Sequence, residues 1–294
     1  ASASGGGDGT SWATAWDTIE DGITWKQGTD IPAIVLVTSG IYYEHDLELD
    51  GSTFPNLEKL ALMGSVPYQR PVIDADSQGR GFSFINITIG KLDSFTITDA
   101  SINTNGAGIF LSGSSPTLSN LLLFNNRATG TGRGGAIYLF GGSSPLILDC
   151  TIAENTGYND YGGIYLSSGT PTISNCIFWD NGDDLSGITA AMIGSSNIED
   201  GDFEGFNNNI SSEPGFYHAY SRYFHLSTFF GQTNPNINTG TSWATMLLDY
   251  EGEGRWNYLS QPATGTGITG LNYYDIGVDE YRDVDYNTLP DWWE

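Results

Sequence analysis

Ser112-Gly-Ser-Ser-Pro-Thr-Leu-Ser-Asn-Leu-Leu-Leu-Phe-Asn-Asn126 is the first of three closely similar stretches in this chain. The other two are Gly141-Gly-Ser-Ser-Pro-Leu-Ile-Leu-Asp-Cys-Thr-Ile-Ala-Glu-Asn155 and Ser167-Ser-Gly-Thr-Pro-Thr-Ile-Ser-Asn-Cys-Ile-Phe-Trp-Asp-Asn181. The prolines at their fifth positions are 29 and then 26 residues apart. That period is typical of a solenoid, in which each repeat stacks on its neighbours.

A second phrase recurs between these stretches and gives each repeat another short apolar run. It occurs as Gly106-Ala-Gly-Ile-Phe-Leu111, Gly134-Gly-Ala-Ile-Tyr-Leu139 and Gly162-Gly-Ile-Tyr-Leu166. Runs this short, separated by turn residues, are typical of β-strands. Apolar residues alternate within the runs and superpose from repeat to repeat, which indicates a face that points inward. The sequence therefore predicts an all-β fold, a single-stranded parallel β-helix with a stacked aliphatic core.

Two cysteines and three asparagines occupy equivalent positions in successive repeats. Cys150 and Cys176 fall on consecutive coils, where neighbouring strands lie about 4.8 Å apart and a disulfide is within reach. Each replaces an inward apolar residue, so the sequence favours two buried thiols, with a disulfide as the alternative. Asn126, Asn155 and Asn181 end the three stretches. We expect them to form a structural ladder of turn residues that tolerate left-handed backbone and hydrogen-bond locally.

The segment before the coils predicts an N-terminal cap. Residues 8–23 are typical of a turn followed by a short helix, with Trp16, Ile19 and Ile23 on one face. Such a helix would cover the open end of a β-helix and prevent end-to-end aggregation. Ala33–Tyr43 then predicts a strand, a glycine turn and another strand, which form the first coil. The predicted division is an N-terminal segment with its capping helix at 1–30, coils at 31–200, an irregular region completing the solenoid at 201–281, and an acidic tail at 282–294.

Composition excludes several classes of partner. The 294 residues include 39 Gly and are 39% hydrophobic and 15% charged, enough for one large core. Asp and Glu number 35 against 10 Lys and Arg, which gives a net charge of −25. Such a polyanion repels nucleic acid and anionic membranes and attracts divalent cations. No segment approaches the roughly 20 apolar residues that span a bilayer. We therefore expect neither a nucleic-acid partner nor membrane insertion.

Motifs along nearly the whole chain resemble the right-handed parallel β-helix modules of secreted bacterial proteins that are called choice-of-anchor Q. The motifs are, in order, Asp8-Gly-Thr-Ser-Trp-Ala-Thr-Ala15, Val37-Thr-Ser-Gly-Ile-Tyr42, Asn175-Cys-Ile-Phe-Trp-Asp-Asn181, Ser196-Asn-Ile-Glu199, Tyr223-Phe-His-Leu226 and Asp275-Ile-Gly-Val-Asp-Glu-Tyr281. The chain departs from the family at Thr233-Asn-Pro-Asn-Ile-Asn-Thr-Gly240. The family usually has Ser-Pro-Ala-Ile-Asp-Ala-Gly there, and this chain lacks the Asp of that motif. The resemblance implies a secreted or surface-anchored module, most of whose relatives have no assigned reaction.

Two further features bear on location and assembly. The opening Ala1-Ser-Ala-Ser-Gly-Gly-Gly7 has neither an initiator Met nor an apolar signal region, as in a mature secreted protein, so we expect an extracellular location. Gly9-Thr-Ser-Trp-Ala-Thr14 is repeated letter for letter at Gly240-Thr-Ser-Trp-Ala-Thr245. The repeat predicts similar capping at the two ends of the solenoid, and end-to-end stacking of copies through residues such as Trp243.

The strongest ion-binding pattern lies in the last twelve residues. Oxygen-bearing side chains fall at relative positions 1, 3, 5, 9 and 12, with a backbone carbonyl at position 7, which is the spacing of a calcium loop. A plain acidic tail is the alternative, because Thr288 stands where the sharp turn prefers Gly. A second acidic run, 199–204, favours a solvated loop over a calcium site. The predicted calcium ligands are Asp283, Asp285, Asn287, Leu289, Asp291 and Glu294.

The alternative to a structural module is an enzyme. Parallel β-helices include polysaccharide lyases and glycoside hydrolases, which need either a calcium-bound carboxylate cluster with a base or paired carboxylates. Stacking of the repeats predicts one loop face that brings together arginines, tyrosines and aspartates. Structural stapling is the favoured interpretation of that face, because fold alone transfers no activity. Its residues are Arg127, Arg133, Tyr158, Asp160, Tyr161, Asp180, Asp183 and Asp184.

The function that the sequence favours is therefore an extracellular structural or adhesive module without catalysis. Its predicted partners are other copies of itself or cell-surface components, including polysaccharide, with calcium as the predicted ion. The three histidines have no metal-ligand spacing on a shared element. No nucleophile elbow of the Gly-x-Ser-x-Gly type and no phosphate-binding glycine loop occurs.

Overall fold

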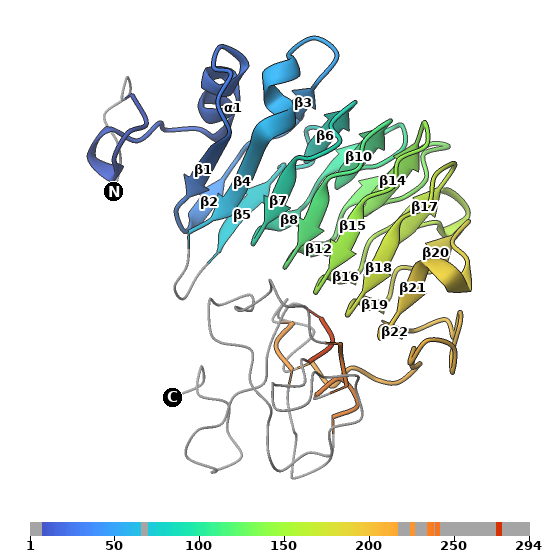
Figure 1. The fold of residues 1–294 in the computed structure, drawn as a ribbon. Helices are drawn as coiled ribbons and strands as arrows, with labels where there is room; N and C mark the ends of the chain where they lie inside the picture. Colours follow the sequence, from blue (N-terminus) through green and yellow to red (C-terminus); the bar gives the residue numbers. More distant parts are fainter. Residues whose placement is uncertain are drawn as a thin grey trace, which may run out of the picture.

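The computed structural model is a right-handed parallel β-helix with one short helix at its N-terminal end (Figure 1). It describes residues 8–65, 70–216, 224–226, 234–237, 239–241 and 275–277. Within these ranges every pairing between named strands is parallel, and each coil adds one strand to each of three sheets. The predicted all-β solenoid is confirmed. The structure shows that its walls are three parallel sheets.

The strands of each sheet follow one another along the solenoid axis. Sheet 1 consists of β1 (Ala33–Val37), β4 (Leu60–Gly64), β7 (Lys91–Asp93), β11 (Thr117–Ser119), β15 (Leu146–Leu148), β18 (Thr172–Ser174) and β21 (Ile193–Gly194). Sheet 2 consists of β2 (Gly40–Tyr42), β5 (Pro71–Asp74), β8 (Thr96–Thr98), β12 (Leu122–Phe124), β16 (Thr151–Ala153), β19 (Ile177–Trp179) and β22 (Asn197–Ile198). Sheet 3 consists of β3 (Leu47–Asp50), β6 (Phe82–Ile85), β10 (Ile109–Ser112), β14 (Ile137–Phe140), β17 (Ile164–Leu166) and β20 (Leu185–Ser186).

The strand register places the apolar residues that superpose from repeat to repeat inside the solenoid. Leu118 pairs with Ile147, and Ile147 with Ile173 on the next coil. All three side chains are buried in one core cluster that extends from Ile19 to Ile198. A short fourth ladder joins β9 (Ser101–Ile102) to β13 (Arg127–Ala128) between sheets 2 and 3. The core follows from the alternation of apolar and polar residues, because every second residue of a strand faces the axis.

The asparagine ladder, defined as Asn126, Asn155 and Asn181, is present and buried. Asn126 Nδ2 donates to Asn155 Oδ1 at 3.0 Å, and Asn155 Nδ2 donates to Asn181 Oδ1 at 3.0 Å. The same Oδ1 atoms accept backbone N–H groups of the neighbouring coil. The prediction of left-handed backbone is displaced by one residue, since Asn125 (φ 55°) and Glu154 (φ 57°) take that conformation instead. The turn before each ladder residue aims the amide inward, where it satisfies buried backbone groups.

Cys150 and Cys176 are free, buried thiols, as the sequence favoured. Each sulfur donates to a backbone carbonyl two residues earlier, Leu148 O at 3.1 Å and Ser174 O at 3.3 Å. Burial raises the pKa of the Cys176 thiol well above its usual range. These thiols fill the core and are not poised as nucleophiles.

Helix α1 (Ile19–Gln27) lies across the start of the solenoid and contacts β1 and β3 (Figure 1). Thr18 caps it by accepting from Asp21 N at 3.1 Å, and the Glu44 carboxylate accepts from Ile19 N at 2.8 Å. Trp16 therefore lies before the helix, and its predicted place on the helical face with Ile19 is wrong. The reason is the cap at Thr18, after which the helix begins at Ile19, three residues beyond Trp16.

The other helices of the described residues are short 3-10 segments, and none of the described helices is long and apolar enough to cross a membrane. They are η1 (Trp12–Thr14), η2 (Pro55–Lys59), η3 (Tyr158–Asp160) and η4 (Ala190–Met192).

Described residues from the C-terminal third occupy two places. Phe203, together with Met192, packs against the far end of the main core. Phe224 instead packs against Phe124, with ring centroids 5.5 Å apart, on the outward face of sheet 2. Three further residues, Leu226, Ile237 and Ile276, pack on outward-facing Ile177 of the same sheet. These described residues therefore lie against the outward face of sheet 2, beyond the last named strand in the sequence.

Candidate functional site

The predicted loop face lies between sheets 2 and 3, and several of its members are exposed on stacked coils. Arg127, Tyr158, Asp160 and Asp180 are exposed. Stacking does bring coils together as expected, since Asp183 N donates to Asp160 O at 2.8 Å. Within the part of the chain that the structure describes, the side chains of these arginines and aspartates form no ion pair with one another.

Arg133 contacts tyrosines rather than carboxylates. Its Nη1 donates to the Tyr165 hydroxyl at 2.9 Å. Its guanidinium carbon lies 5.0 Å from the Tyr165 ring centroid and 5.5 Å from that of Tyr161. Cation–π contacts of this geometry hold neighbouring coils together. Arg133 therefore staples the loop face, which is the structural interpretation that the sequence favoured.

Tyr165 belongs to an aromatic ladder, defined as Phe110, Tyr138 and Tyr165, on the outward face of sheet 3. Phe110 and Tyr138 stack at 5.9 Å with planes 7° apart, and Tyr138 and Tyr165 at 5.4 Å with planes 2° apart. The guanidinium of Arg80 lies 4.9 Å above Phe110. Every ring of the ladder has a protein group over a face. A sugar could stack on these rings only by displacing those groups.

Asp184 is buried and bound by donors. Its Oδ1 accepts from Asn181 Nδ2 at 2.9 Å, and its Oδ2 accepts from Glu199 N at 3.0 Å. Burial raises the pKa of Asp184 to about 7, the charges of Asp200 and Glu199 add to the rise, and the hydrogen bonds oppose it. A pKa of that size suits a general acid, but a fully buried carboxyl cannot reach a substrate. Asp184 ends the asparagine ladder instead.

The acidic run 199–204 forms a local turn, in which Asp200 Oδ1 accepts from Asp202 N at 3.0 Å. Among the described residues, no group of three His, Cys, Asp or Glu side chains is placed to hold a metal ion. The predicted calcium loop, with Asp283, Asp285, Asn287, Leu289, Asp291 and Glu294, lies outside the described residues. Trp243 also lies outside them.

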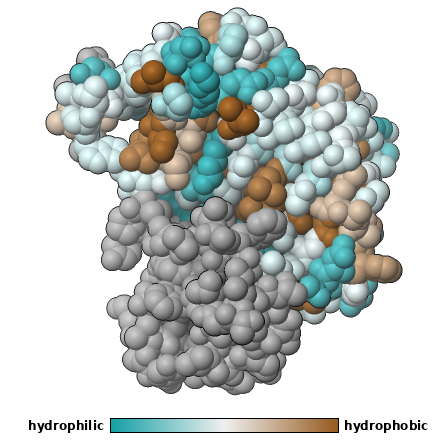
Figure 2. Space-filling model, viewed as in Figure 1, coloured by the Kyte–Doolittle hydropathy of each residue, from teal (hydrophilic) through white to brown (hydrophobic). Residues whose placement is uncertain are grey.

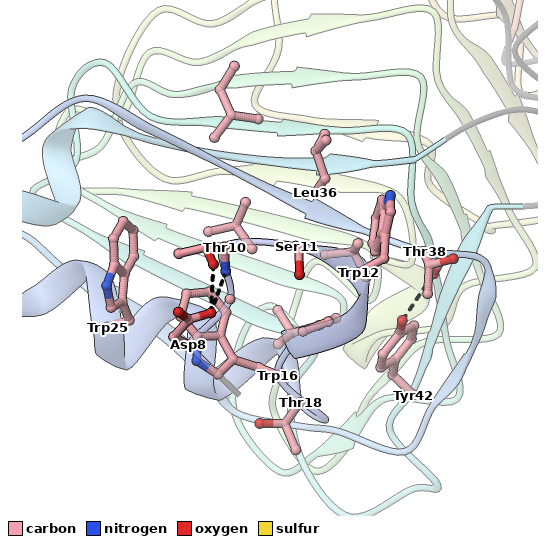
Figure 3. Close-up of a pocket in the computed structure, with 16 residues that line it drawn as sticks. Asp8, Thr10, Ser11, Trp12, Trp16, Thr18, Trp25, Leu36, Thr38 and Tyr42 are labelled. Atoms are coloured by element: carbon pink, nitrogen blue, oxygen red, sulfur yellow. Dashed lines mark hydrogen bonds between the residues drawn. The ribbon is translucent and has the colours of Figure 1, made fainter. Parts of the chain in front are cut away.

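A groove of about 620 Å³ lies between the loop 8–16 and the outward face of β1 (Figure 3). We call it the first-coil groove. The apolar part of its lining includes Trp12, Trp25, Ile34 and Leu36. Trp12 is 54% exposed, Ile34 63% and Leu36 53%. Figure 2 shows hydrophobic residues gathered at this N-terminal end of the molecule.

The loop over the groove is held by one carboxylate. Asp8 Oδ1 accepts from Thr10 N at 3.1 Å, from Thr10 Oγ1 at 2.7 Å and from Thr14 Oγ1 at 2.7 Å. These hydrogen bonds lower the pKa of Asp8 to about 2. Gly9 has φ +69°, and a Cβ there would lie 2.4 Å from the Trp16 ring, so the turn requires glycine. The loop is therefore ordered around the Asp8 carboxylate.

Sequence reasoning treated this segment only as a cap and missed the groove. A signal was present in Ala33-Ile-Val-Leu-Val37, which is apolar at every position. Only Val35 and Val37 face the core. An unbroken apolar run in the first coil predicts either a covered or a ligand-binding outward face.

The model of the family described as "Right handed beta helix region" matches residues 75–229. The chain belongs to this β-helix family. Among curated proteins, none matches the chain. One similar solved structure is the pectin methylesterase from Aspergillus niger in deglycosylated form, which is 16% identical. The match covers 66% of this chain and 73% of the esterase chain, with a TM-score of 0.32. A likeness this distant does not extend to activity.

Proposed function

We propose that this chain is a secreted or cell-surface β-helix module of the choice-of-anchor Q type, with an adhesive and non-catalytic role. In this proposal the solenoid is a rigid support and the first coil carries the binding surface. The observation that supports it most is the first-coil groove, where Trp12, Ile34 and Leu36 are more than half exposed. Exposed apolar surface of this kind marks interaction sites in extended repeat proteins. The proposed partner is surface polysaccharide.

The contacts on the loop face support a role without catalysis. Lyase or hydrolase chemistry would need a base and an acid that reach the sugar. Arg133 is bound to Tyr165, and Asp184 is buried beneath the loop. These contacts argue against Arg133 as the base and Asp184 as the acid of the enzyme alternative.

Co-sedimentation with insoluble polysaccharides, combined with an assay for released oligosaccharides, tests the proposal. We expect the protein to bind at least one polysaccharide and to release nothing from it. A Leu36→Ser variant should lower the bound fraction, because it removes apolar surface from the groove without touching the core. Release of oligosaccharides that disappears in Arg133→Ala would overturn the proposal in favour of the enzyme.

Self-assembly is the competing form of the same structural role, and electron microscopy distinguishes it. Dispersed particles with and without calcium would favour adhesion. Ordered filaments that are lost in Trp243→Ala would show that the module acts by stacking on copies of itself. That result would replace polysaccharide by a second copy as the partner.

Calcium binding at residues 283–294 is a separate part of the proposal. The oxygen spacing of that segment supports it. Calorimetric titration with calcium should show one site that is lost in Asp285→Asn. Equal heats for both proteins would identify the segment as a plain acidic tail.

A further inference from the structure

The rim of the first-coil groove carries polar atoms with unused hydrogen-bonding capacity. Asp8 Oδ1 accepts three hydrogen bonds, whereas Asp8 Oδ2 accepts none from the described residues. The indole N–H groups of Trp12 and Trp25 likewise have no acceptor within the described part of the chain. One anionic acceptor and two neutral donors therefore border a largely apolar groove (Figure 3). A ligand with both hydroxyl groups and a cationic donor complements this set.

The walls of the groove suit a flat ring with apolar C–H faces. Trp12 is 54% exposed and has no ring partner among the described residues. Trp25 is 39% exposed and packs against Trp16, whose ring centroid lies 5.5 Å away. Ile34 and Leu36 provide the opposite apolar surface. A volume of about 620 Å³ lies within the usual range of small-ligand sites. Indole faces bind the C–H faces of sugars, and they also attract cations.

Charge decides which kind of sugar the groove would take. The chain carries −25, and Asp8 is an ionised carboxylate at physiological pH, as an exposed aspartate is. Glu20 and Asp21 are exposed in the first turn of α1, whereas Lys26 of the same helix is buried. This field repels acidic glycans and a second acidic copy of the chain, and it attracts a cation. A positively charged saccharide would complement all three features: its C–H faces the apolar walls, its hydroxyl groups the indole N–H donors, and its charge the negative field.

We infer that the first-coil groove binds an amino sugar within a glycan chain, with the sugar's ammonium group on Asp8 Oδ2 and its ring against Trp12. The inference rests on the proposed adhesive function and names the class of glycan. No covalent step is involved. The sequence Gly9–Thr14 recurs at Gly240–Thr245, where Thr239 stands in the place of Asp8. The second copy therefore lacks the carboxylate that would pair with the amine.

Calorimetric titration of the full chain with three oligosaccharides of equal length tests the inference. The probes are an oligomer of glucosamine, its fully N-acetylated form and a glucose oligomer. We expect the glucosamine oligomer to bind about tenfold more tightly than the N-acetylated form, because acetylation removes the charge and keeps the ring. Equal affinities would overturn the inference and leave the adhesive function standing. Failure of every soluble and insoluble glycan to bind would overturn both.

Matched variants separate a specific ion pair from general attraction. Asp8→Asn keeps the Oδ1 acceptor that orders the loop and removes the charge, and we expect about a fivefold loss of affinity for the glucosamine oligomer. Asp160→Asn makes the same chemical change on an exposed side chain of the far loop face, and it should change the affinity less than twofold. Equal losses in both variants would show that long-range charge alone attracts the ligand, which contradicts the proposed site.

The tryptophan contact has a test of its own. Trp12→Ala should weaken all ring-stacking ligands by about tenfold while the circular dichroism spectrum and the melting temperature stay as in the parent chain. Unchanged affinity with an intact fold would place the ligand elsewhere and overturn the inference.

Discussion

The middle coils and the first coil both carry aromatic side chains on the outside of the solenoid, but they use them differently. In the aromatic ladder each ring is stacked on another ring or beneath a guanidinium. In the first-coil groove, Trp12 presents open surface beside Ile34 and Leu36, whereas Trp25 is partly covered by Trp16. Aromatic content alone therefore does not locate a binding site. The deciding property is whether the ring faces are already occupied by the protein.

Sheet 1 shows the same contrast along one column. Outward-facing Ile34 pairs with Ala61, and Ala61 pairs with Lys91 on the next coil. The column changes from large and apolar to charged within three coils. Only its first member is largely exposed and apolar, so the end of the solenoid is chemically distinct from its middle.

The largest effect is expected in the closed middle of the molecule. Asn155→Ala removes the central amide of the asparagine ladder and leaves buried groups unpaired, among them Asn126 N and the Leu123 carbonyl. At about 1–3 kcal/mol for each unpaired group, we expect a loss of about 5 kcal/mol in the free energy of unfolding. Urea denaturation measures it. Ser167→Ala, an exposed change on a neighbouring turn, is the control and should alter stability by less than about 0.5 kcal/mol.

The second prediction concerns pH and the carboxyl that ends the ladder. The pKa of Asp184 is raised from 3.8 to about 7 by burial. The folded protein therefore binds this proton more tightly than the unfolded chain. Its stabilising contribution is complete below about pH 4 and is lost as the pH rises through 7, a change of up to about 4 kcal/mol.

Denaturation between pH 4 and 8 compares the parent chain with Asp184→Asn, which cannot titrate. We expect the parent to lose more stability than the variant over this interval, whatever their absolute stabilities. Parallel curves would show that the buried carboxyl has an ordinary pKa and that the ladder ends in an ionised group.

The fold was predictable because the repeats carry redundant information. The three stretches ending at Asn126, Asn155 and Asn181 repeat both the apolar alternation and the turn residues, so each coil supports the assignment of the next. The predicted left-handed position was wrong by one residue. Asn125 and Glu154 both adopt that conformation, but their different side chains gave no common sequence pattern by which to recognise it.

The site was less predictable, because a site depends on what each group touches. The sequence brought Arg133 and Tyr161 to one face correctly, but it could not show that the guanidinium lies over the tyrosine rings. It placed Asp184 beside the loop, but burial of the side chain is a property of packing. The groove lies between β1 and a loop that Asp8 orders through Thr10 and Thr14, and these residues fall outside the repeats.

The third prediction breaks the aromatic ladder itself. Tyr138→Ala removes the ring that stacks on both neighbours and is only 8% exposed. We expect a loss of about 2 kcal/mol in the free energy of unfolding, since both stacking contacts and buried area disappear. Thermal unfolding checks it against Tyr158→Ala, whose ring is 41% exposed and stands outside the ladder. Equal losses would mean that stacking adds nothing to the middle coils.

The smallest effect on stability is expected in the groove. Trp12→Ala removes a large ring, but that ring is more than half exposed and lies in a single 3-10 turn. We expect the free energy of unfolding to change by less than about 0.5 kcal/mol. A loss as large as that of Tyr138→Ala would show that Trp12 is packed like the ladder, and the contrast between the two regions would fail. A stable variant that no longer binds its glycan would show that this ring serves recognition, because its surface was never used to hold the fold together.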